Sequence, residues 1–162
     1  MERPRIYLDT SIVSFLYAED EPEKRGITIE FFENYLMKYE VAISRVVILE
    51  ITRTTDTVRR NQLLEAVHKY SLPEIRLTPA EDEEVSALAD EYLRRGVIPP
   101  SKPEDALHLA IATVLEYDIL LSWNFRHLAN VRKQAQVDEV NSQTGYHHTL
   151  SLLNPMQVIY EE

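Results

Sequence analysis

The stretch RIYLDTSI, residues 5–12, decides the fold, because a short apolar run stops at Asp9 and two hydroxyl residues, Thr10 and Ser11, follow at once. The apolar run predicts a buried strand over residues 5–9. Asp, Thr and Ser also cap helices by accepting hydrogen bonds from free backbone N–H groups, so a turn alone accounts for Asp9. A functional role for its carboxylate therefore depends on the rest of the chain.

Further strand patterns alternate with helical patterns along the chain. Strands are expected at residues 40–44, 74–78, 118–122 and 156–160. Helices are expected at residues 12–18, from Pro22 onward, and at 46–51, 58–70, 82–95, 106–117 and near 127–132, whereas residues 134–149 show no pattern. Because parallel neighbouring strands need a crossover that is usually a helix, the alternation predicts an α/β fold with a mostly parallel sheet.

Length and composition predict one globular domain over residues 1–162, because 44% hydrophobic content suffices for one core. The sequence has no run of about 18 apolar residues, so neither a membrane span nor a secretory signal is expected. We therefore expect a soluble, cytoplasmic protein with no membrane partner. The absence of cysteine excludes disulfides and thiolate chemistry, so any metal must use oxygen or nitrogen ligands.

The net charge of −10, from 27 acidic and 17 basic residues, argues against nucleic-acid binding through a general basic surface. Two routes to nucleic acid stay open for an acidic protein. One is a local basic strip, and the other is a bound cation that neutralises a cluster of carboxylates.

Glu50 is the most unusual acid, since it lies within the apolar run VVILEI, residues 46–51. Burying an ionised carboxylate is costly unless it is paired or bound to a metal, so Glu50 requires a partner. Arg45 and Arg53 are the nearest candidates for an ion pair. A metal ion is the alternative.

Asp105 lies at the start of a predicted helix in SKPEDALHLAIA, residues 101–112. Ser101 and Glu104 have the spacing of a capping box, which accounts for Glu104 but not for Asp105. The helix dipole favours a negative charge in this first turn. His108, three residues further on, is close enough on the same helix face to hydrogen-bond to Asp105, and we expect it to be a packed or pairing histidine rather than a metal ligand.

Four motifs together resemble the PIN-domain ribonucleases, in particular the VapC-type toxins of toxin–antitoxin systems. They are YLDTSI with Asp9, VVILEI with Glu50, PEDALHLAIA with Asp105 and LLSWNFRHL with Asn124. The resemblance spans almost the whole chain, and YLDTSI and DALHLAIA are its more specific parts. It implies an α/β/α sandwich, an endoribonuclease that depends on Mg²⁺ or Mn²⁺, frequent formation of a homodimer, and often inhibition by an antitoxin.

The resemblance also implies a site. Asp9, Glu50 and Asp105 would be the catalytic, metal-binding trio, with Glu50 and Asp105 acting through water and with Thr10 or Ser11 supporting Asp9. Asn124 would be a weak further metal ligand. A metal-activated water would attack the RNA phosphodiester. Many family members carry Asp where this chain has an Asn, at position 124. The lost negative charge weakens binding of a second metal ion, so the sequence leaves open whether one ion or two ions bind.

Three arginines are candidates for contact with the RNA backbone, because the forked guanidinium suits phosphate: Arg45, Arg53 and Arg126. The apolar residues between Ile27 and Leu36 are expected either to pack on the sheet or to form a dimer face.

Two other functions are alternatives to a ribonuclease. A phosphatase of the haloacid dehalogenase type needs a second Asp two residues after the first, where Ser11 stands. The stronger alternative is a PIN fold kept as a non-catalytic or weakly catalytic binding module.

Overall fold

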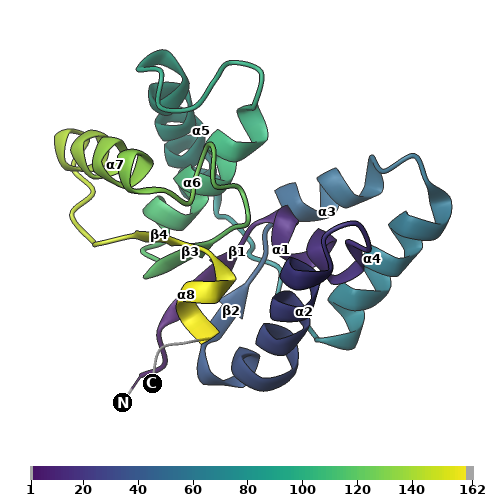
Figure 1. The fold of residues 1–162 in the computed structure, drawn as a ribbon. Coiled ribbons are helices and arrows are strands. Elements are labelled where there is room, and N and C mark those ends of the chain that lie inside the picture. The colour runs from purple at the N-terminus through teal and green to yellow at the C-terminus, as the bar shows by residue number, and fades with distance from the viewer. Residues whose placement is uncertain (1, 160–162) are drawn as a thin grey trace.

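A parallel sheet lies between two groups of helices in the computed structural model, which describes residues 2–159 (Figure 1). Within these residues the sheet consists of β1 (Arg5–Leu8), β2 (Glu40–Ala42), β3 (Ile119–Leu121) and β4 (Ser151–Leu153), in the order β2-β1-β3-β4. Every neighbouring pair of these strands is parallel. The predicted parallel sheet is therefore confirmed.

Helices connect and cover these strands. They are α1 (Thr10–Ser14), α2 (Pro22–Glu30), α3 (Arg45–Thr52), α4 (Thr57–Lys69), α5 (Pro79–Arg94), α6 (Pro103–Val114), α7 (Val131–Gln143) and α8 (Pro155–Ile159). Shorter turns of 3-10 helix cover Phe15–Tyr17 and Leu36–Lys38, and a π-helical turn, Phe31–Tyr35, continues α2. Among the residues described, none of the helices has the length and apolar character needed to cross a membrane.

Alternation of side chains along β1 produces the two hydrophobic layers. Tyr7 packs with residues of α5, α6 and α7 on one face of the sheet. Ile6 and Leu8 point to the other face and pack with residues of α1, α3, α4 and α8. The two groups of helices lie on opposite sides of the sheet in Figure 1, so the expected α/β/α sandwich is confirmed.

The apolar face between Ile27 and Leu36 packs into the protein. Phe31 and Phe32 are buried, and Ile27 and Tyr35 are partly buried against the same cluster. Packing within the molecule, the first of the two expectations for this face, is the one that the structure shows.

The strand predicted at residues 74–78 is wrong. This segment forms one isolated bridge, between Glu74 and Ile43, and then leads into α5. Thr78 caps α5 in a capping box with Glu81, so the helix begins at Pro79 rather than at residue 82. Apart from the first turn of α5, the segment forms a backbone hydrogen bond with Ile43 alone within residues 2–159, at Ile75 N–H, and the N–H of Thr78 donates to the Glu81 side chain instead of a neighbouring strand. Gly96 ends the helix as predicted, with a φ of +74°.

The C-terminal predictions are also largely wrong. Helix α7 occupies much of the stretch that showed no pattern, and it buries Val137 and Val140. The last strand is β4, whereas most of the predicted strand at 156–160 is helix α8, and Tyr160 lies outside the described residues. Asn154 explains the switch, because its side chain accepts a hydrogen bond from the backbone N–H of Met156 and so starts a helical turn.

Candidate active site

Asp9 lies directly after β1, and its side chain is almost completely buried, at 3% exposure. One carboxylate oxygen accepts hydrogen bonds from the backbone N–H of Ser11, at 3.1 Å, and from the Ser11 hydroxyl. The other accepts a hydrogen bond from the hydroxyl of Ser122. Asp9 is therefore both the cap of α1 and a buried acid at the carboxyl end of the sheet.

The loops after β1 and β3 are joined through these hydroxyl groups. The backbone N–H of Trp123 donates to Ser11 Oγ at 2.9 Å, and that of Asn124 donates to Ser122 Oγ at 2.9 Å. Sequence reasoning missed Ser122. The sequence does place a polar residue, Ser122, at the end of a predicted strand. Its pairing with Asp9 depends on the register of β1 and β3, which sets Leu8 beside Leu121.

Glu50 has partners other than those expected. Its Oε1 accepts hydrogen bonds from His108 Nε2, at 2.6 Å, and from Thr10 Oγ1, at 2.7 Å. His108 is a buried, paired histidine as expected, but its carboxylate partner is Glu50 rather than Asp105. Thr10 contacts Glu50, while Ser11 contacts Asp9.

Arg53, one of the two arginines considered for Glu50, instead pairs with Glu104 at 3.0 Å. Glu104 takes no part in the expected capping box, because α6 begins at Pro103 and Lys102 occupies the cap position without a side-chain hydrogen bond. Ser101 is thus one residue too early to cap this helix. Arg45 forms no ion pair with Glu50 among the residues described.

Asp105 and Asn124 complete the cluster. Asp105 lies in the first turn of α6, and its Oδ2 accepts a hydrogen bond from Asn124 Nδ2 at 3.2 Å. Asn124 Oδ1 in turn accepts from the backbone N–H of His127 at 2.9 Å. The end of β1, helix α3, the start of α6 and the loop after β3 each contribute one of the four predicted site residues.

The carboxylates differ in their protonation behaviour. Burial raises the pKa of Asp9, and the charge of Glu50 adds to this increase, while His108 and two serine hydroxyls oppose it. Burial also raises the pKa of Asp105 to about 6, helped by the charges of Asp9 and Glu50 and opposed by His108 and Lys102.

Glu50 behaves in the opposite way. Burial alone would raise its pKa, but the hydrogen bond and charge of His108 and the hydrogen bond of Thr10 outweigh burial, so the pKa of Glu50 is lowered.

Comparison with known proteins identifies the family. The sequence of residues 6–133 matches the PIN domain family. The chain belongs to the PIN domain family. Its fold is also that of a chain in the solved structure of VapBC2 from Rickettsia felis bound to a DNA fragment from their promoter, with a TM-score of 0.57 and 17% identity over 93% of this chain and 98% of that one. No curated protein matches the sequence. PIN domains are generally nucleases that use divalent metals, so membership supports hydrolysis of nucleic acid.

The acid cluster of this PIN domain fits a hard divalent cation. Asp9 and Asp105 form no ion pair with Lys or Arg within residues 2–159, although Asp9, Glu50 and Asp105 lie close enough for their charges to act on one another. Oxygen donors of this kind are the ligands of Mg²⁺ and Mn²⁺. In the same part of the chain, no three His, Asp or Glu side chains are placed to hold a metal by themselves. Mg²⁺ keeps several waters and needs only one or two carboxylates, so such a cage is not required.

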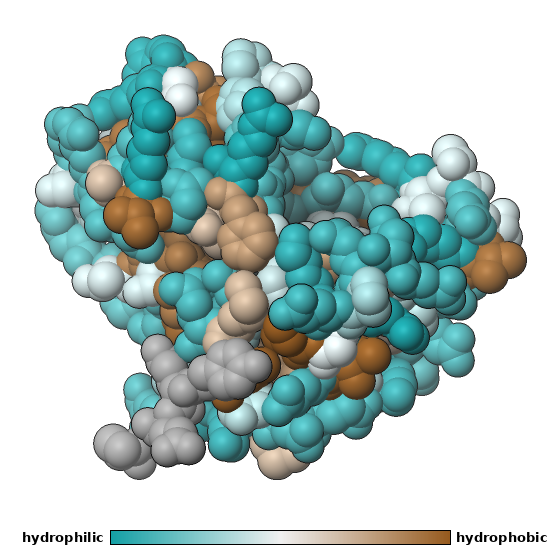
Figure 2. Space-filling view, viewed as in Figure 1, coloured by the Kyte–Doolittle hydropathy of each residue, from teal (hydrophilic) through white to brown (hydrophobic). Residues whose placement is uncertain are grey.

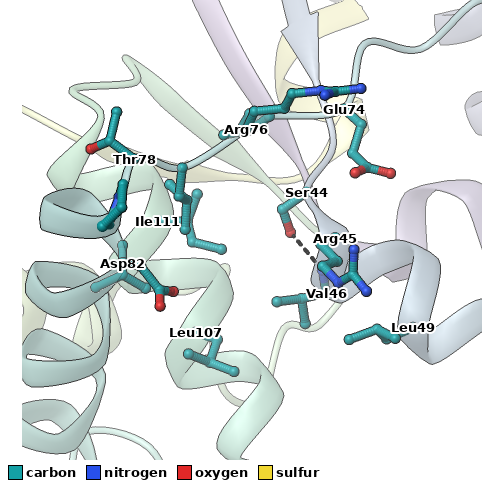
Figure 3. Close-up of a pocket in the computed structure, with 14 residues that line it drawn as sticks. Ser44, Arg45, Val46, Leu49, Glu74, Arg76, Thr78, Asp82, Leu107 and Ile111 are labelled. Carbon is teal, nitrogen blue, oxygen red and sulfur yellow. Dashed lines mark hydrogen bonds between the residues drawn. The ribbon is translucent and has the colours of Figure 1, made fainter.

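The surface of the PIN domain is hollowed between the α5–α7 side and the α1–α4 side, and hydrophilic side chains dominate this face (Figure 2). Arg126 is exposed in the turn after Asn124. Arg45 lies elsewhere, in a groove of about 710 Å³ lined by α3, α5, α6 and the segment before α5. Figure 3 shows Arg45 beside Ser44 and Val46 at the start of α3 in this groove. Arg53 pairs with Glu104, the neighbour of Asp105 in the first turn of α6, and its charge acts on Glu50, so contact of the three arginines with RNA stays a prediction.

Proposed function

We propose that this PIN domain, residues 1–162 as a single domain, is a metal-dependent endoribonuclease of the VapC toxin type. The observation that carries the proposal is the convergence of Asp9, Glu50 and Asp105 from three different elements, without a Lys or Arg paired to Asp9 or Asp105 in the described chain. Buried carboxylates without such a counter-ion gain the most from a bound cation.

In the proposed mechanism, Asp9 and Asp105 would hold Mg²⁺ or Mn²⁺, and Glu50 would bind through water. When bound, the cation stabilises negative charge on the phosphate and favours ionisation of the attacking water. Glu50 Oε1 is occupied by His108 and Thr10, whereas no hydrogen bond reaches Oε2 within residues 2–159. Oε2 is therefore free to orient the water and accept its proton.

The proposed partners are an RNA substrate and an antitoxin, and the proposed assembly is a homodimer. The antitoxin is suggested by the shared fold with a chain of the Rickettsia felis VapBC2 complex. RNA rather than DNA is suggested by the resemblance of YLDTSI and DALHLAIA to ribonuclease motifs.

The direct test is incubation of the purified protein with a mixed cellular RNA pool in Mg²⁺, Mn²⁺ or EDTA. We expect internal cleavage with either metal and none in EDTA. Equal cleavage in EDTA would contradict a metal-dependent mechanism.

A second candidate function is a binding module with a degenerate site. It is favoured by Asn124, whose side-chain amide donates a hydrogen bond to Asp105 Oδ2. An Asp at position 124 would instead add a fourth carboxylate, and thus a further negative charge, to the site. Calorimetric titration with Mn²⁺ separates the two functions, because a degenerate site should give no heat that depends on Asp9.

We expect Asn124→Asp to strengthen binding of a second cation and to destabilise the metal-free protein. The variant keeps the Oδ1 atom that accepts from His127 N, but it replaces a donor to Asp105 with a like charge. Loss of this hydrogen bond should lower the free energy of unfolding in EDTA by about 1 kcal/mol. Calorimetric stoichiometry and denaturant melts measure the two effects, and unchanged stoichiometry would argue that position 124 does not face the cation.

We expect Arg126→Ala to weaken RNA binding about equally for all sequences, because a guanidinium at this exposed position contacts phosphate rather than bases. The slope of log K against log salt should fall by about 1. Fluorescence anisotropy with two unrelated RNA oligonucleotides at several salt concentrations measures this. Arg60→Ala, on helix α4, is the control: it removes the same charge from a partly buried side chain that donates to the Thr54 carbonyl, and it should leave the slope unchanged.

A further inference from the structure

His108 takes no direct part in the proposed reaction, yet it is buried at the centre of the site, at 2% exposure. It lies on α6 between two other elements of the fold. Its Nε2 contacts Glu50 Oε1 on α3 at 2.6 Å, and its Nδ1 contacts the hydroxyl of Tyr7 on β1 at 2.5 Å. Tyr7 OH also contacts Ser44 Oγ, at the cap of α3, at 2.7 Å.

The direction of these hydrogen bonds is constrained at one end. An ionised carboxylate only accepts, so the contact with Glu50 requires a proton on His108 Nε2. Ser44 Oγ already accepts the backbone N–H of Val46 at 3.2 Å, which leaves its own proton free to point at Tyr7. Tyr7 then donates to Nδ1, and every polar atom along the path from Ser44 through Tyr7 and His108 to Glu50 Oε1 has a hydrogen-bond partner.

We propose that His108, oriented by Tyr7 and Ser44, is a positioning residue that fixes Glu50 through Oε1 and keeps Oε2 available to the cation and its water. The consequence for catalysis rests on the proposed nuclease function. These hydrogen bonds join β1, which Asp9 directly follows, to α3 and α6, which carry Glu50 and Asp105. A substitution at Tyr7, Ser44 or His108 therefore alters the position of Glu50 without removing a contact to the substrate.

Thr10 alone does not replace His108. Its hydroxyl reaches the same Glu50 oxygen from α1, at 2.7 Å, but within residues 2–159 its one other side-chain hydrogen-bond contact is with His108 Nε2, at 3.4 Å. Tyr7 and His108 are both buried and their ring centroids lie 5.6 Å apart, so packing holds the imidazole in place. Of the two donors to Glu50, only His108 belongs to a chain anchored in the core.

The test compares two amide substitutions of similar polarity. In His108→Gln the side-chain NH₂ lies near the position of Nε2 and can still donate to Glu50, whereas in His108→Asn it lies near Nδ1 and cannot. We expect His108→Asn to lose about 10- to 100-fold in Mn²⁺ affinity by calorimetry, and His108→Gln to recover most of this loss. Thermal melts in EDTA establish whether the two variants are equally folded.

Imidazole ¹⁵N shifts of the wild-type protein give a readout that needs neither a variant nor activity. A protonated Nε2 supports the proposal, and an unprotonated Nε2 overturns it. Equal Mn²⁺ affinity of the His108→Gln and His108→Asn variants overturns it as well. If the Gln and Asn variants differ as expected but the wild-type protein cleaves no RNA, the positioning role stands and the nuclease function fails. If the wild type cleaves RNA while the two variants behave alike, the nuclease stands and the positioning role fails.

Discussion

Asp9→Asn is expected to lower metal-dependent RNA cleavage about 100- to 1,000-fold, because it removes a charge that stabilises the cation and hence several kcal/mol of transition-state stabilisation. Among the three proposed carboxylates, Asp9 is the most deeply buried, and its two oxygens are held by Ser11 and Ser122. Single-turnover cleavage of a labelled RNA in Mn²⁺ measures the loss.

The same substitution should leave the fold intact. Asn is as good a helix cap as Asp, so its Oδ1 can accept from Ser11 while its NH₂ group donates to Ser122 Oγ. Burial raises the pKa of Asp9, which shows that the ionised form is disfavoured in the metal-free protein. We therefore expect the free energy of unfolding in EDTA to stay equal or to rise.

Asp56→Asn is the matched control. Asp56 is also the cap of a helix, since it accepts a hydrogen bond from the backbone N–H of Arg59 at the start of α4, but it lies outside the acid cluster. It should retain full cleavage. Loss of cleavage in both variants would point to a general effect of the substitution, and retention in both would remove Asp9 from the site.

Local sequence patterns predicted the centre of the fold because its elements are determined locally. The apolar run before Asp9 forms β1 as expected, and Ser44 and Pro22 mark the starts of α3 and α2 as expected. The carboxyl ends of parallel strands meet at one edge of the sheet, so the placement of Asp9 near Asn124 also followed from the pattern.

The partners within the site could not be read from local patterns. His108 and Glu50 are 58 positions apart, and they meet only because α3 and α6 pack together. The expected contact between His108 and Asp105 relied on helical spacing alone, whereas the imidazole turns toward α3. Ser122 likewise became a partner of Asp9 through the register of β1 and β3.

The C-terminal errors have a different cause. Strand β4 has only three residues, too few for a periodic signal, and its role depends on pairing with β3. The residues of α8 are rich in β-branched and apolar side chains and fit a strand by propensity, but Asn154 and the burial of Val158 and Ile159 select a helix. Tertiary contacts overrode local preference in this region.

Affinity for Mn²⁺ is expected to fall about tenfold between pH 7 and pH 5, because a cation competes with protons for the carboxylates. Asp105 contributes to this range, since burial and the charges of Asp9 and Glu50 raise its pKa to about 6, and burial raises the pKa of Asp9 as well. Glu50 has a lowered pKa and stays ionised across the range. Calorimetric titrations at several pH values measure the change, and Asp105→Asn should flatten it.

Stability of the metal-free protein should show the opposite trend. The pKa of Asp105 is about 6 in the folded protein and near the ordinary value of 3.8 in the unfolded chain, so between these values the folded state binds more protons. Its free energy of unfolding therefore rises as the pH falls from 7 through 6. Saturating Mn²⁺ should reverse this trend, because the bound cation favours the ionised form. Denaturant melts with EDTA or Mn²⁺ at each pH test both signs, and an EDTA curve with the same slope in wild type and Asp105→Asn would show that Asp105 is not the group responsible.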